Sequence, residues 1–198
     1  MTPDGKPVKA SRIFLGREHE FQTSRIENHF GKSKGYCNDI RYDVERIRTL
    51  LREADDNKKL IPSCMEGTGP FPAKSSKEWI IGQFASCEDA YLQLLIDLTC
   101  MLKYSVQLVD NTATKTIFIE GGFGDNDVFM NLLANHFPGK KIKVSFLKQA
   151  TALGAVLQIN ESAKLEDWKF QSYTASDISG LLESYCQKNH RDTGTQSS

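Results

Sequence analysis

The feature that most constrains the fold is an alternation of strand and helix patterns in the second half of the chain. Residues 116–120 (TIFIE) are apolar and β-branched and predict a strand, and residues 127–137 predict a helix that a Pro-Gly pair ends. A second strand is predicted over residues 142–147, and a second helix, rich in small residues, over residues 149–159. The order strand, helix, strand, helix with short connecting loops indicates a sheet covered by crossover helices.

The most regular helix pattern lies in the middle of the chain. Ser86, followed after one residue by two acidic residues, is typical of a helix start. Apolar residues then recur at positions i, i+3, i+4 and i+7 as far as Val106. A stripe of this kind is interpreted as core, so residues 86–106 are predicted to form a long buried helix.

Shorter elements are predicted on either side of this helix. The N-terminal part should contain a strand over residues 8–15 and helices over residues 18–30 and 42–54. Residues 60–72 are rich in proline and glycine and should form no regular structure. A last helix is expected over residues 176–187.

The two ends of the chain carry predictions of their own. Residues 3–7 (PDGKP) have the sequence of a tight turn between two strands, with too few residues before the turn for the first strand. We therefore expect the chain to start inside a domain, with a loose N-terminal loop as the alternative. The domain should cover residues 1–188, and residues 189–198 should form a disordered polar tail.

Charge and hydropathy exclude two classes of protein. The 25 basic residues balance the 25 acidic residues, whereas a dedicated nucleic-acid binder normally carries a basic excess on one face. No apolar run approaches the roughly 20 residues of a membrane span, and the N-terminal region lacks a signal-peptide core. The sequence therefore predicts a soluble, cytoplasmic protein without nucleic-acid or membrane partners.

Neither the cysteines nor the histidines show a metal-binding spacing. No two cysteines form a C-x-x-C pair, so we expect reduced, mostly buried thiols and neither a disulfide framework nor a zinc site. The cysteines are Cys37, Cys64, Cys87, Cys100 and Cys186. Each histidine is expected to lie at the surface or to be hydrogen-bonded. The histidines are His19, His29, His136 and His190.

Residues 121–126 (GGFGDN), here called the glycine turn, are the first candidate site. Glycines let a ligand approach the backbone, and the amides at the start of the following helix favour an anion. The turn is not a Walker loop, and it fails the G-x-G-x-x-G pattern because Asp127 stands at the third glycine position. That failure disfavours a dinucleotide-binding Rossmann enzyme. A nucleotide site and a simple strand-to-helix turn both stay open.

Two further segments could contribute to a site. Thr68 lies between Gly67 and Gly69, where amides and a hydroxyl could cradle a phosphate, although the same residues also make an ordinary loop. The small residues at 149–155 (QATALGA) suit a tightly packed helix, and such a helix could also form the wall of an adenine pocket.

Taken together, these segments resemble the C-terminal domain of the FGGY family of carbohydrate kinases, which includes rhamnulokinase, xylulokinase and glycerol kinase. That family has a Gly-Gly-x-x-x-Asn turn after a strand and a closing Ala-x-Ala-Leu-Gly-Ala-Ala helix. The matching residues here are Gly121, Gly122 and Asn126, and residues 150–156 (ATALGAV). The specific match covers residues 86–158.

The resemblance implies an α/β, ribonuclease-H-like (actin-like ATPase) fold, a mixed sheet flanked by helices that forms an incomplete C-terminal kinase domain. It implies an ATP-dependent carbohydrate kinase that transfers the γ-phosphoryl group of MgATP to a sugar hydroxyl, with ATP and Mg²⁺ as cofactors. Gly121 and Gly122 would approach the adenosine and the α-phosphate, Asn126 would lie near the nucleotide, and Thr68 is a weaker candidate.

The resemblance also implies what this chain lacks. The Asp-x-Gly-Thr phosphate loop and the aspartate that deprotonates the sugar would lie in an N-terminal part, so we expect no catalytic or metal-binding residue here and no activity of the chain alone. Phe123 stands where many relatives have glycine or alanine. Gly124 and Asp125 stand where Ser-Arg or Ser-Lys is common, so a basic phosphate contact would be lost.

These departures keep a second interpretation open. The chain could be a non-catalytic actin-like module, a degenerate kinase remnant that binds a partner or a sugar. In either case an exposed cleft wall and an unpaired strand edge favour a homo-oligomer.

Overall fold

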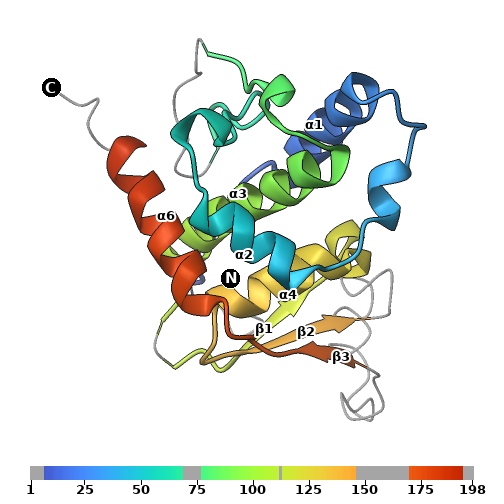
Figure 1. The fold of residues 1–198 in the computed structure, drawn as a ribbon. Helices are drawn as coiled ribbons and strands as arrows, with labels where there is room; N and C mark the ends of the chain where they lie inside the picture. Colours follow the sequence, from blue (N-terminus) through green and yellow to red (C-terminus); the bar gives the residue numbers. More distant parts are fainter. Residues whose placement is uncertain (1–6, 69–76, 112, 146–169, 194–198) are drawn as a thin grey trace, which may run out of the picture.

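A small mixed sheet lies beneath a layer of packed helices in the computed structural model, which describes residues 7–68, 77–111, 113–145 and 170–193 (Figure 1). The helices are α1 (Leu15–His29), α2 (Val44–Arg52), α3 (Cys87–Gln107), α4 (Asp127–His136) and α6 (Ser179–Thr193). The strands are β1 (Thr116–Ile119), β2 (Lys141–Ser145) and β3 (Phe170–Tyr173). The described helices lie on one side of the sheet (Figure 1).

The sheet has the strand order β1-β2-β3. β1 and β2 are parallel, with Ile117 opposite Ile142, and β3 runs antiparallel to β2. Helix α4 connects the two parallel strands and packs against β2, where Ile142 and Val144 are buried. The predicted strand–helix–strand unit is therefore confirmed, and so is the mixed α/β sheet. Strand β3 was not predicted.

Helix α3 is the centre of the core. Its cap is Ser86, whose hydroxyl accepts a hydrogen bond of 3.1 Å from the Asp89 amide, as the sequence predicts. The helix contacts α1, α2 and α4, and side chains around its whole circumference are buried. Among the described residues, none of the helices combines the length and the apolar character that a membrane crossing requires.

The N-terminal region differs from the prediction. Residues 8–15 form no strand, and helix α1 begins at Leu15, so that Gly16 lies in its first turn instead of ending a strand. A strand needs a neighbour to satisfy its backbone groups, and none of the strands in the described ranges pairs with this segment. Its apolar residues Ile13 and Leu15 pack against the core just before and at the start of the helix.

Predictions nearer the C-terminus can be compared only in part. Helix α6 begins three residues later than predicted and extends to Thr193, past the predicted start of the polar tail. The helix predicted over residues 149–159 lies outside the described residues, and so does the end of the proline- and glycine-rich stretch after Thr68. The described part of that stretch contains no helix or strand, as predicted.

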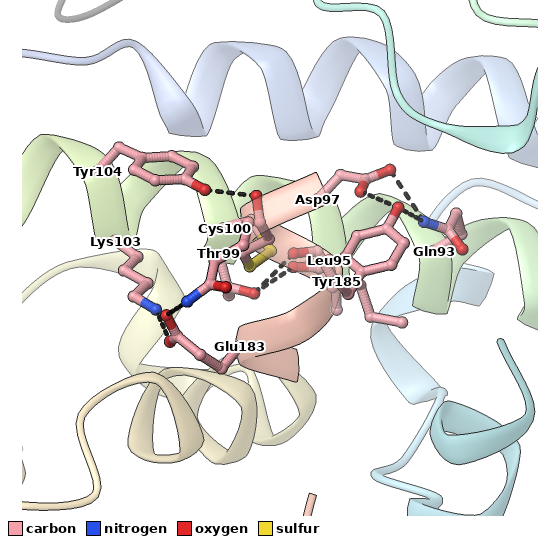
Figure 2. Close-up of a disulfide and its surroundings, with 12 residues drawn as sticks. Gln93, Leu95, Asp97, Thr99, Cys100, Lys103, Tyr104, Glu183 and Tyr185 are labelled. Carbon is pink, nitrogen blue, oxygen red and sulfur yellow. Dashed lines mark hydrogen bonds and ion pairs between the residues drawn. A yellow bond between two sulfur atoms is a disulfide. The ribbon is translucent and has the colours of Figure 1, made fainter. Parts of the chain in front are cut away.

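The prediction that all cysteines are reduced is wrong for one pair. Cys100 on α3 and Cys186 on α6 form a disulfide, with their Cα atoms 5.6 Å apart (Figure 2). The two residues are separated by 86 positions, so no local spacing could reveal the pairing. The remaining three cysteines are free, and Cys37 and Cys87 among them are buried, as expected.

Candidate functional site

The glycine turn connects the carboxyl end of β1 to the start of α4 (Figure 1). Gly121 has φ 94°, a left-handed value that residues with a side chain rarely adopt, and residues 122–125 form a single 3-10 turn. A Cβ atom added at Gly121 or Gly122 would meet no atom within 4 Å. The turn therefore presents bare backbone to open space, at the edge of the sheet where open α/β folds bind ligands.

Phe123 and Gly124, in the middle of the turn, face the interior. A Cβ at Gly124 would lie 2.8 Å from Cγ1 of Val144, so this glycine is needed for the packing of the turn on β2. The ring of Phe123 stacks on Phe129 with centroids 4.2 Å apart and meets the edge of His19 at 5.2 Å. Phe123 thus fills space beneath the turn, and the ligand-facing surface belongs to the two glycines before it.

The Asn126 side chain fixes the turn to two helices. Its Oδ1 accepts a hydrogen bond of 2.9 Å from the Phe129 amide and caps α4, and its Nδ2 donates one of 2.8 Å to the Tyr91 hydroxyl on α3. Both polar ends of the side chain are therefore engaged within the protein. A direct contact between Asn126 and a nucleotide stays a prediction, whereas its positioning role is visible in the structure.

The Tyr91 hydroxyl also lies 3.1 Å from Nε2 of His19 on α1. The donor in the bond between Tyr91 and His19 depends on the histidine tautomer, because the Tyr91 oxygen can accept from Asn126 and still either donate to Nε2 or accept from it. Burial lowers the pKa of His19 to about 4, an effect that Glu20 partly offsets, and burial raises the pKa of Tyr91. This chain of hydrogen bonds is neutral at physiological pH and holds α1, α3 and the glycine turn together.

Thr68 is not part of the surface of the glycine turn. Its hydroxyl donates a hydrogen bond of 2.6 Å to the Met65 carbonyl, and the residue is 6% exposed. It lines a recess of about 430 Å³ whose other walls include Arg12, Glu66 and Leu108. None of the residues of the glycine turn lines this recess, so the structure does not bring these two predicted site segments together in one pocket.

Sequence reasoning missed His19 and Tyr91 as partners of the turn. Tyr91 was interpreted only as core, and His19 as a surface or hydrogen-bonded residue. The latter is confirmed by its bond to Tyr91, but the 72 residues between them conceal the pairing. His29 is exposed, as expected, whereas His136 is buried without a hydrogen-bond partner, against the prediction.

The turn is acidic in character. From Glu120 to Asp127 the sequence contains three carboxylates and no lysine or arginine. Asp127 is partly engaged, because its Oδ1 accepts a hydrogen bond of 3.0 Å from Asn131. Carboxylate oxygens suit Mg²⁺, and an anion reaching the turn would need a counter-ion to offset these charges. The residues present therefore fit a magnesium–nucleotide complex better than a bare phosphate group.

Comparison with known proteins identifies a family. The chain matches the family model described as Carbohydrate kinase FGGY, C-terminal domain, over residues 1–167. No curated protein matches the chain.

Solved structures of similar fold agree with this match. They include a carbohydrate kinase from Novosphingobium aromaticivorans, with a TM-score of 0.67 and 18% identity over 94% of this chain. A ligand-bound xylulose kinase from Lactobacillus acidophilus (TM-score 0.59, 15% identity, 91% of this chain) and Plasmodium falciparum glycerol kinase with ADP (0.51, 16%, 79%) are also similar. The chain spans only 37%, 38% and 34% of these three proteins. The likeness confirms the predicted actin-like ATPase fold.

Proposed function

The chain belongs to the family of C-terminal domains of FGGY carbohydrate kinases, and we propose that it forms the nucleotide-binding part of an ATP-dependent carbohydrate kinase. The complete kinase would transfer the γ-phosphoryl group of MgATP to a sugar hydroxyl. The chain spans about 37% of its first structural neighbour, so the base that activates the sugar and most sugar contacts are assigned to the remainder of such an enzyme.

The observation that carries this proposal is the bare backbone of Gly121 and Gly122 at the carboxyl end of a parallel strand. A flat or anionic group can lie directly on this backbone, because no side chain intervenes. The amide groups at the start of α4 add a partial positive charge beside it. We assign the adenosine and the α-phosphate to this surface, with Asn126 holding it in place.

Mg²⁺, when bound with the nucleotide, would offset the negative charge of its phosphates. The contribution of this chain is to bind and orient the nucleotide and, on closure against a second domain, to exclude water from the phosphoryl group. The carboxylates of Asp125 and Asp127 follow the two glycines in the sequence and would favour the magnesium complex over free nucleotide. Thr68 stays a weaker candidate, since it belongs to a separate recess.

A second candidate function has a specific observation in its favour. The glycine turn carries no basic residue, and both polar ends of Asn126 are already engaged. A non-catalytic module that binds a partner or a sugar would need neither a phosphate clamp nor a free asparagine. The two proposals differ in one measurable property, which is the affinity for MgADP.

The activity itself can be tested on the chain and on any longer product of its gene. We expect the chain alone to release no phosphorylated product from MgATP with xylulose, gluconate or glycerol, and the longer product to phosphorylate a sugar or polyol. A longer product that binds MgATP weakly or not at all, and that transfers no phosphoryl group, would favour the non-catalytic module. The cytoplasmic location predicted from the sequence stays a prediction.

A further inference from the structure

His136, the last residue of α4, is a buried polar side chain without a polar partner. It is 6% exposed, and neither Nδ1 nor Nε2 has a hydrogen-bond partner. Buried ring nitrogens normally have a hydrogen-bond partner, because a nitrogen that loses its bonds to water without gaining new ones costs free energy. Burial and the nearby charge of Lys103 lower the pKa of His136 to about 3, so the ring is neutral and offers a lone pair.

The His136 side chain lies against the disulfide that joins α3 to α6. A ring nitrogen of His136 and the Sγ atoms of Cys100 and Cys186 all lie within 4.8 Å of one another, and all three residues are buried. We call this set the thiol–imidazole cluster. Its members come from α3, α4 and α6, and α4 packs against each of the other two helices. Figure 2 shows the two sulfur atoms where α3 and α6 meet.

We propose that the thiol–imidazole cluster is a Zn²⁺ site when the disulfide is reduced. A dithiol reductant would convert the Cys100–Cys186 disulfide into two thiols and would itself become a disulfide. Zn²⁺ would then displace one proton from each thiol and form bonds to both sulfurs and to a ring nitrogen of His136. Two thiolates and an imidazole are a donor set that zinc commonly takes in proteins.

The geometry requires only small movements. Zinc–sulfur bonds of about 2.3 Å and zinc–nitrogen bonds of about 2.0 Å place tetrahedral donors roughly 3.5 to 3.8 Å apart. Donor atoms that now lie within 4.8 Å of one another can reach this spacing by side-chain rotation, with the two sulfurs moving apart. The Cα atoms of the cysteines, 5.6 Å apart, leave room for that separation.

The charges around the cluster also fit. Zn²⁺ with two thiolates adds no net charge to the core, so it does not conflict with the ammonium group of Lys103, which forms an ion pair with Glu183 (Figure 2). Water would complete the tetrahedron. The zinc–nitrogen bond would give one orphaned nitrogen of His136 the partner it lacks.

The chain contains a matched comparison for this proposal. Cys37 and Cys87 are also buried, and their Sγ atoms lie 3.8 Å apart. Among the described residues, no third histidine, cysteine or carboxylate joins this pair in a group that could hold a metal ion. Burial raises the pKa of both thiols, which opposes the thiolate form that a metal needs. Comparison of the two pairs therefore distinguishes the effect of two adjacent thiols on metal binding from the effect of a buried histidine beside them.

The test is titration of the metal-free chain with Co²⁺ and Zn²⁺, in its oxidised form and after reduction by a phosphine. We expect the reduced chain to bind one Co²⁺ with sulfur-to-cobalt charge-transfer bands and intense tetrahedral d–d bands, and the oxidised chain to show neither. His136→Phe, which keeps the volume filled, and Cys186→Ser should each weaken Zn²⁺ binding at least 100-fold. The double variant Cys37→Ser and Cys87→Ser should bind Zn²⁺ as the parent does.

Three results would overturn the proposal. They are a reduced chain that binds neither metal, Zn²⁺ binding that is equal in the oxidised and reduced forms, and binding that is lost in the Cys37/Cys87 variant but kept in the Cys186 variant. The comparison of oxidised with reduced parent needs no substitution, so it decides the question even where a core variant does not fold. MgADP binding plays no part in any of these measurements.

Discussion

Nδ2 of Asn126 donates a hydrogen bond of 2.8 Å to the hydroxyl of Tyr91, which ties the glycine turn to the buried helix α3. The same asparagine caps α4 through its Oδ1. One side chain therefore sets the position of the turn relative to the core and starts the helix that follows. The bare backbone of Gly121 and Gly122 is held in place from within.

Removal of the Asn126 side chain should lower the free energy of unfolding. Asn126→Ala loses both the helix cap and the bond to Tyr91, and we expect a loss of about 2 kcal/mol, measured by urea denaturation. Asn126→Asp is the matched control, because it keeps the cap and loses only the donor to Tyr91; it should lose less. An alanine variant as stable as the parent would contradict this positioning role.

Substitution by alanine should lower the stability of the fold at one glycine of the turn and leave it nearly unchanged at another. At Gly124 the new methyl group would lie 2.8 Å from Val144, and we expect a destabilisation of about 1–3 kcal/mol. At Gly122 the methyl group meets open space, and stability should change by less than about 0.5 kcal/mol. Urea unfolding of both variants checks the pair. Equal losses would mean that the turn packs differently from the structure.

Loss of the Cys100–Cys186 disulfide should destabilise the chain more than any single surface change. The cysteines are 86 positions apart, and closing a loop of that size restricts the unfolded chain by about 4.6 kcal/mol. We expect Cys186→Ser to show a loss of this order in the presence of a metal chelator. The control is Cys64→Ser, at a free and partly exposed cysteine, which should stay within about 0.5 kcal/mol of the parent.

His19 should make the fold sensitive to mild acid. Burial lowers its pKa to about 4 in the folded chain, against about 6.5 when unfolded, so at pH 5 the unfolded chain binds a proton that the folded chain does not. The stability that neutral His19 provides is complete above pH 6.5 and is lost as the pH falls toward 4.

The comparison of His19→Gln with the parent isolates this effect. Between pH 7 and pH 5 the parent should lose about 2 kcal/mol more stability than the variant, as measured by urea denaturation at both pH values. The buried His136 contributes equally to both proteins and cancels. Equal acid sensitivity of the two proteins, or a ring resonance of His19 that titrates near pH 6.5, would show that the ring is better solvated than its contacts with Tyr91 and Phe123 imply.

Local patterns were enough to predict the central part of the fold. The helical spacing of apolar residues after Ser86 identified α3, and the order of strand, glycine turn, helix and strand identified β1, α4 and β2. Each of these elements follows from the pattern of residues within its own short segment. The prediction of a strand over residues 8–15 was wrong, because alternating apolar residues such as Ile13 and Leu15 can also pack on a core without a pairing strand.

Contacts between residues far apart in the chain could not be predicted from the sequence. Strand β3 has only four residues and pairs with β2, which lies 25 or more positions earlier in the chain. The bond from His19 to Tyr91 spans 72 positions and the disulfide spans 86, so neither leaves a local spacing to find. The bare surface of Gly121 and Gly122 was foreseen from residue type alone, whereas the engagement of Asn126 needed the position of α3.

Binding of a nucleotide to the glycine turn is the central property assigned to this chain. We would record the amide ¹H–¹⁵N spectrum of the chain during titration with MgADP, which still reports millimolar binding. We predict shifts centred on Gly121, Gly122 and Asn126, and their loss in Gly122→Val, where the side chain enters open space without disturbing the fold. No shift in the parent at saturating MgADP, or equal shifts in the valine variant, would contradict the assignment and favour the non-catalytic module.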